Sequence, residues 1–123
     1  MTPEVAALIE TWPEAALDRF IEIRRIILDA ADTPPDESLK WGQPAWRAAR
    51  GTTLRCNWSA DRAQVITLYV ICTSDMAARV KELYPDAFTF EGSRGFAMPL
   101  SAPLPRTAIS HLARMAHRYH AGR

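Results

Sequence analysis

Apolar residues recur at helical spacing in two long stretches of the chain. Between Glu14 and Ala31 they are three or four positions apart, and a second stripe follows Pro105. This period predicts two amphipathic helices, each with one face that must pack against other elements. A short helical turn is expected after Thr2, and Thr11 with Glu14 has the spacing of a capping box before the first long helix.

Residues between the two long helices have the character of strands, rich in β-branched and aromatic residues and bounded by turn residues. The expected strands are 38–41, 45–48, 52–58, 64–72, 88–91 and 96–100, with a short helix over 74–84. Strands in close succession favour an antiparallel sheet, and the apolar helix stripes need one face of it. The sequence therefore predicts a single domain over residues 1–123: an α+β two-layer sandwich with N- and C-terminal helices on one sheet face.

The composition is that of an ordinary globular domain, with 123 residues, 48% of them hydrophobic and 24% charged. No apolar run approaches the ~18 residues needed to cross a bilayer. The segment Met1–Glu4 lacks the basic region and apolar core of a secretory signal. We therefore expect a cytoplasmic protein that has no membrane partner.

Two cysteines, Cys56 and Cys72, lie in apolar, strand-like segments and form no CxxC motif. In a cytoplasmic chain, cysteines at such positions behave as small hydrophobic residues rather than as a redox or metal pair. We expect both to be buried and unpaired.

Charge is divided unevenly along the chain. Residues 1–38 contain nine acids and three bases, whereas residues 39–123 contain five acids and twelve bases. Such a division can indicate a surface for nucleic acid or an acidic partner, but an acidic helix packed on a basic body gives the same division. Because no basic run is interleaved with aromatic residues, we do not expect nucleic acid as a partner.

Acidic residues form a row along the first long helix. Glu14, Asp18 and Glu22 continue from Glu10 in steps of four, which places successive carboxylates near one another on a helix face. Exposed oxygen ligands suit weak binding of Fe²⁺ or Mn²⁺ without a closed cage. The alternative is a solvated helix face that Arg19 partly neutralises. We expect no tightly bound cofactor, and weak Fe²⁺ binding at Glu14, Asp18 and Glu22.

The sheet face away from the helices is the second candidate site. If Leu54 and Cys56 face the core, Arg55 points away from it. Converging aromatic and polar side chains make a good surface for a ligand or protein partner. The alternative is a structural role, with Glu91 in ion pairs and tryptophans packed over a sheet edge. The predicted binding residues are Lys40, Trp41, Gln43, Trp46, Arg55, Tyr69, Glu91 and Arg94.

Catalytic signals are weak. The sequence contains no GxSxG, HExxH, phosphate-loop or dinucleotide motif, so we expect a protein that is not an enzyme. His117 and His120 are three residues apart on the last helix, but arginines flank them and no carboxylate or cysteine lies nearby in sequence. An exposed basic helix is therefore favoured over a metal site there.

Several separated segments together resemble the YdhG-like family, a bacterial domain family of unknown function. ESLKWGQPAW, from Glu37 to Trp46, resembles the family's hallmark segment. GTTLR (51–55), LY (68–69), YPDAF (84–88), FEGSR (90–94) and HRYH (117–120) fall where the other signatures of the family would. The resemblance covers roughly residues 12–120.

This resemblance implies a frataxin-like fold, an antiparallel sheet with both terminal helices on one face. It also implies a role, because one bacterial relative is described as a frataxin-like iron chaperone for iron–sulfur and haem assembly. Frataxins use acidic surface along their first helix and meet the assembly machinery through the sheet. The leading hypothesis is therefore an iron chaperone that binds iron at Glu14, Asp18 and Glu22 and docks an iron–sulfur or haem assembly protein. The rival is a metal-independent module that binds a ligand or protein on the sheet face.

Overall fold

The computed structural model describes residues 1–121. In chain order its elements are α1 (Pro3–Ile9), α2 (Glu14–Asp29), β1 (Asp36–Lys40), β2 (Gln43–Arg47), β3 (Leu54–Asn57), the 3-10 turn η1 (Ala60–Arg62), β4 (Val65–Tyr69), α3 (Met76–Leu83), β5 (Thr89–Glu91), β6 (Gly95–Pro99) and α4 (Arg106–His117). The predicted order of helices and strands is confirmed.

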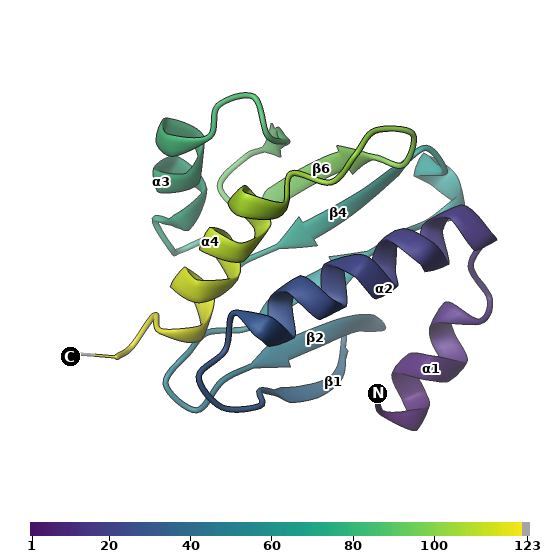
Figure 1. Cartoon of the computed structure of the whole chain (residues 1–123), viewed down its shortest axis with the longest axis horizontal. Helices are drawn as coiled ribbons and strands as arrows, with labels where there is room; N and C mark the ends of the chain where they lie inside the picture. Colours follow the sequence, from purple (N-terminus) through teal and green to yellow (C-terminus); the bar gives the residue numbers. More distant parts are fainter. Residues whose placement is uncertain (122–123) are drawn as a thin grey trace.

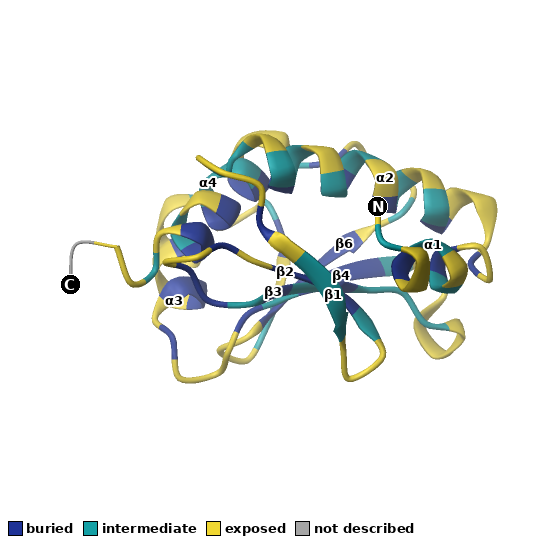
Figure 2. Cartoon of the chain, turned by 90° about the horizontal axis from the view of Figure 1, so that it is seen from below, coloured by how far each residue is buried: buried dark blue, intermediate teal, exposed yellow. Residues whose placement is uncertain are grey.

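The six strands form one antiparallel sheet in the order β1-β2-β3-β4-β6-β5. The long helices α2 and α4 lie side by side across the sheet (Figure 1) and cover one of its faces (Figure 2). α3 packs against α4 at one end of the sheet. The fold is therefore an α+β two-layer sandwich with an open sheet face, as the sequence predicts.

The core lies between the helices and the sheet. On α2, the fully buried residues Phe20, Ile23 and Ile27 follow the helical period, because only that stripe faces the strands. On β3 the residues alternate, with Leu54 and Cys56 buried beneath the helices and the residues between them on the other face. This alternation decides which side chains reach the open face.

A buried carboxylate ties the first third of the chain together. The side chain of Glu37, on β1, is only 8% exposed. Its Oε1 accepts hydrogen bonds from Arg24 Nε of α2 at 2.6 Å and from Trp46 Nε1 of β2 at 2.9 Å, and its Oε2 accepts one from the backbone N–H of Thr2 at 2.7 Å. Burial favours the neutral acid, but these donors outweigh it and hold the pKa of Glu37 below its ordinary value.

Two local predictions are wrong. Thr11 does not cap α2: α1 and the turn after it extend to Thr11, whose hydroxyl donates to the Leu8 carbonyl at 2.6 Å, and α2 begins after Pro13. Cys56 is buried as expected, and burial raises the pKa of its thiol, but Cys72 is exposed. The reason is that β4 ends at Tyr69, so Cys72 lies in the loop beyond the strand.

We expect the variant Glu37→Gln to be less stable by about 2 kcal/mol at pH 7, because a neutral amide replaces the buried carboxylate that accepts from the half-buried guanidinium of Arg24 and from the donors around it. A lowered pKa in the folded state means that the carboxylate stabilises the fold above about pH 5 and loses this effect as the pH falls through its folded pKa. Denaturant unfolding at pH 7 and pH 3.5 measures the difference from the wild type, which should shrink at the lower pH.

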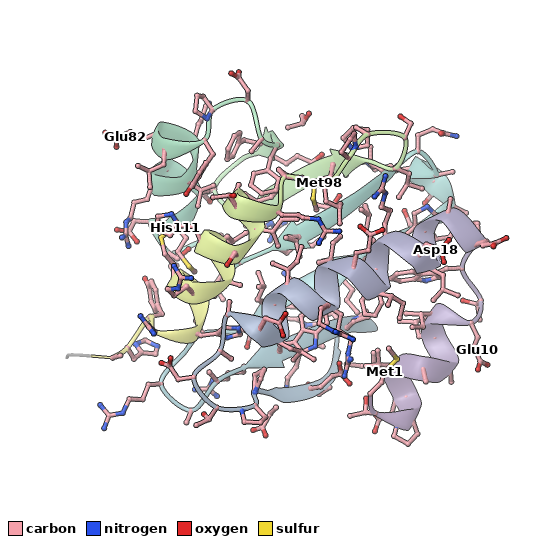
Figure 3. All side chains as sticks on the ribbon, viewed as in Figure 1. Met1, Glu10, Asp18, Glu82, Met98 and His111 are labelled. Atoms are coloured by element: carbon pink, nitrogen blue, oxygen red, sulfur yellow. The ribbon has the colours of Figure 1, made fainter. Side chains whose placement is uncertain are left out.

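Glu82, on α3, is an exposed carboxylate (Figure 3) and provides the matched control. Glu82→Gln should change the unfolding free energy by less than about 0.5 kcal/mol. An equal difference between Glu37→Gln and the wild type at both pH values would contradict the role assigned to this carboxylate.

Candidate functional site

The strand register brings polar side chains into one row across the open sheet face. Arg55 of β3 lies opposite Tyr69 of β4, which lies opposite Gly95 of β6, and Gly95 lies opposite Glu91 of β5. Residues paired across antiparallel strands point to the same face. The predicted placement of Arg55, Tyr69 and Glu91 on one face is therefore confirmed.

The turn between β1 and β2 carries an unusual residue. Lys40 pairs with Gln43, so Trp41 and Gly42 form a two-residue turn, and their φ values are +51° and +73°. Positive φ at both central residues is the pattern of a type I′ turn, which favours Asn, Asp or Gly at the first position. A bulky residue there is strained by about 1–2 kcal/mol. Trp41 nevertheless occupies the position, and it is 83% exposed.

Three side chains hold the guanidinium of Arg55 in place. Its Cζ lies 4.7 Å from the centre of the Trp41 ring and 5.2 Å from that of Tyr69, and its Nη1 donates to Gln43 Oε1 at 2.7 Å. Cation–π contacts of this kind contribute about 0.5–1 kcal/mol each near a surface. The guanidinium is therefore fixed between two rings, while only one of its donors is bonded to a neighbouring side chain.

Within the described residues no acid neutralises the charge at this position. Burial of the guanidinium, and next the positive charge of Arg94, hold the pKa of Arg55 below its ordinary value. Within residues 1–121 neither arginine pairs with a carboxylate. The nearest acid in the row, Glu91, forms a two-pronged ion pair with Arg62 of η1 instead.

These side chains line a shallow pocket of about 360 Å³, whose walls are Trp41, Gln43, Arg55, Tyr69 and Arg94. We call it the Arg55 pocket. Its volume is near the lower end of the range for small-molecule sites. Two aromatic rings, two arginines and an amide without any acid suit a compact anion, because guanidinium groups bind carboxylates and phosphates through paired hydrogen bonds.

The structure gathers most of the predicted binding residues on this face. Lys40 is exposed beside Gln43 at the sheet edge, although it does not line the Arg55 pocket. Trp46 is a correction: it is 0% exposed, stacks on Phe20 with ring centres 5.8 Å apart and donates to Glu37. It lies opposite the buried Leu54 on the helix-facing side of β2, so it belongs to the core.

The acidic row is less compact than the sequence suggests. Glu10 lies on the end of α1, whereas Asp18 lies on α2 (Figure 3). Glu22 is bound by Arg19 at 3.3 Å and by Arg106 of α4 at 3.1 Å, while Glu14 and Asp18 are exposed. Across residues 1–121, no three His, Cys, Asp or Glu side chains converge as metal ligands. Iron binding by Glu14, Asp18 and Glu22 stays a prediction.

The histidines of the last helix differ from their predicted exposure. His117 is only 5% exposed, and its Nε2 lies 2.8 Å from the Ile27 carbonyl oxygen, so this nitrogen is the donor. His111 lies between α3 and α4 (Figure 3), where its Nδ1 is 2.9 Å from the Tyr84 hydroxyl. Both histidines connect α4 to neighbouring segments, and a structural role explains both contacts.

Two residues important to this face were not anticipated. Arg62 occupies the polar tip after β3, where nothing in the local sequence indicates that it reaches Glu91 on the far strand. Glu37 was considered only as the first residue of the segment that resembles the YdhG-like family, although its carboxylate anchors the hairpin that carries Trp41. The only signal for this role in the sequence is the position of an acidic residue directly before the expected strand 38–41.

No family model, curated protein or solved structure matches this chain. The resemblance to the YdhG-like family therefore stays a prediction. The protein has a defined class of architecture: an α+β sandwich whose open sheet face carries an arginine held between aromatic rings. No helix in the described part of the chain is long and apolar enough to cross a membrane.

The strain at Trp41 leads to a stability prediction. In Trp41→Asn, an amino acid that tolerates positive φ replaces one that does not, while a weak cation–π contact is lost. We expect an unfolding free energy that is unchanged or raised by up to about 1 kcal/mol. In the matched variant Trp46→Ala, a buried ring is removed, and we expect a loss of about 3–5 kcal/mol. Urea unfolding measures both, and a clear loss in Trp41→Asn would contradict the strain argument.

Proposed function

We propose that this protein is a metal-independent binding module that recognises an anionic group at the Arg55 pocket. The observation that carries the proposal is the guanidinium of Arg55, which lies between two rings beside Arg94 with no carboxylate partner in the described chain. A bound carboxylate or phosphate would relieve the repulsion between the two arginines and accept their remaining hydrogen bonds.

Preorganisation supports this choice over a solvated arginine. A flexible side chain loses rotamer entropy when it binds an anion, and this loss weakens the interaction. In this site Gln43, Trp41 and Tyr69 already restrict the Arg55 side chain. The aromatic walls also lower the local dielectric, which strengthens a charge-assisted hydrogen bond. Both effects favour anion binding at Arg55 over the exposed arginines on the helices.

The iron-chaperone role that the family resemblance implies is the second hypothesis. It depends on Glu14, Asp18 and Glu22, of which Glu22 is engaged by two arginines. The Arg55 pocket is a poor metal site, because all its charged groups are cationic. The two hypotheses therefore concern opposite faces of the molecule and separate in one set of experiments.

Amide and side-chain NMR spectra during a titration with inorganic phosphate, at constant ionic strength, test the anion site. The largest shifts are expected at the Trp41 indole and at the side chains of Arg55 and Arg94. Because a hydrogen bond to a charged group contributes about 1.5–3 kcal/mol, Arg55→Gln should weaken phosphate binding roughly 10- to 100-fold. The control Arg79→Gln removes an exposed arginine of α3 and should leave the affinity unchanged. Equal losses in the two variants would indicate unspecific attraction and refute the proposal.

Metal removal separates the two hypotheses. Phosphate binding at the Arg55 pocket should be the same before and after metal ions are removed on a chelating resin, and the same in the triple variant Glu14→Gln, Asp18→Gln, Glu22→Gln. In a parallel anaerobic Fe²⁺ titration, paramagnetic broadening around those three residues, abolished in the triple variant, would support iron binding. Loss of phosphate binding after metal removal would contradict a metal-independent module.

A further inference from the structure

We infer that the ligand of the Arg55 pocket is a small compound with a planar aromatic ring and one phosphate or carboxylate group. Its ring stacks on the exposed indole of Trp41 and its anion lies against Arg55 and Arg94. This inference rests on the anion site proposed above and adds the chemical class of what binds there.

The first argument is the exposure of Trp41. Among the large hydrophobic side chains that the structure describes as exposed, this one has the greatest exposed fraction at 83%, and the next, Leu83, has 56%. Arg55 lies over part of the indole and leaves most of the ring open to solvent. Exposed indoles act as stacking platforms for planar ligands, because the ring is rigid and loses little entropy on binding.

The second argument is the conformation of the turn. Asn or Gly at position 41 would satisfy the positive φ without strain, and neither would lower the solubility of the hairpin. Strained positions persist where the surrounding structure holds them, and they gather at ligand sites. The β1–β2 turn directs the indole toward Arg55 and thus places the platform beside the charged group that the anion would contact.

The third argument limits the size of the ligand. Proteins that bind single-stranded nucleic acid follow the backbone with a continuous groove of positive charge. On this face Arg62 is neutralised by Glu91 and Arg47 donates to the Gly51 carbonyl, so the pocket itself is lined by only two charged groups, Arg55 and Arg94. Together with a pocket volume of about 360 Å³, this distribution fits one anionic group and one ring rather than a polymer.

Five probes separate the ring from the anion: adenosine 5′-monophosphate, ribose 5-phosphate, adenosine, phenylacetate and acetate. We expect the monophosphate to bind at least about tenfold more tightly than either ribose 5-phosphate or adenosine. The four indole N–H signals of the protein report the contact, and the signal of Trp41 should shift most. Phenylacetate tests whether the anion is a carboxylate: tighter binding of phenylacetate than of acetate, lost in Trp41→Asn, would assign the carboxylate form of the same ligand class.

Trp41→Asn is the decisive variant, because we expect it to fold at least as stably as the wild type. It should abolish the preference for the monophosphate over ribose 5-phosphate, whereas ribose 5-phosphate itself should lose only the smaller part of its affinity that comes from the restriction of Arg55 by the indole. Arg55→Gln should weaken both. As a fold control, Glu82→Gln should bind all five probes as the wild type does.

The outcomes distinguish the two levels of inference. If ribose 5-phosphate binds through Arg55 but neither adenosine 5′-monophosphate nor phenylacetate gains affinity from Trp41, the aromatic ligand class is wrong and the anion site stands. If no probe, including inorganic phosphate, binds the wild type, the anion site fails and the ligand class fails with it.

Discussion

The carboxylate of Glu37 joins four segments of the chain, and the position of the β1–β2 hairpin depends on it. Its partners come from the N-terminus, α2 and β2, so one buried charge connects the helix layer to the sheet edge. An edge hairpin has a neighbouring strand on one side only, and its turn would otherwise be poorly held. Because Trp46 also stacks on Phe20, the hairpin is fixed by a hydrogen bond and by core packing together.

This anchoring explains how a strained residue can sit at the tip of the same hairpin. The stabilising contacts lie at one end of the strand pair, where Glu37 is opposite Trp46. The strained backbone of Trp41, with its positive φ, lies at the other end. A cooperative domain tolerates a local cost of about 1–2 kcal/mol if the rest of the structure stabilises the segment. The hairpin thus places the Trp41 indole on the open face beside Arg55. Asn, Asp or Gly at the same turn position would leave Arg55 uncovered.

Patterns of spacing were sufficient to predict the layers but not the contents of the site. The alternation around Leu54 and Cys56 correctly placed Arg55 on the open face, because side-chain direction in a strand follows from parity alone. The prediction for Trp46 was wrong because parity was not applied to it: Trp46 lies three residues after Gln43 on β2, so the two side chains point to opposite faces of the sheet. The pairing of Arg62 with Glu91 depends on strand order, β4-β6-β5, and no local pattern carries that information.

Ion pairs within the fold join acids of the first part of the chain to bases of the last part, as the uneven charge distribution of the sequence allows. Acids of the first half meet arginines of the last helix across the helix layer, as in the contacts of Arg106 with Glu22 and of Arg118 with Asp32. Of the acidic row that an iron site would need, Glu22 is therefore already paired with arginine. On the opposite face two arginines are left beside each other without an acid, and this arrangement is unfavourable for the protein alone. A protein that only needed solubility could separate these charges, whereas one that binds an anion benefits from keeping them together.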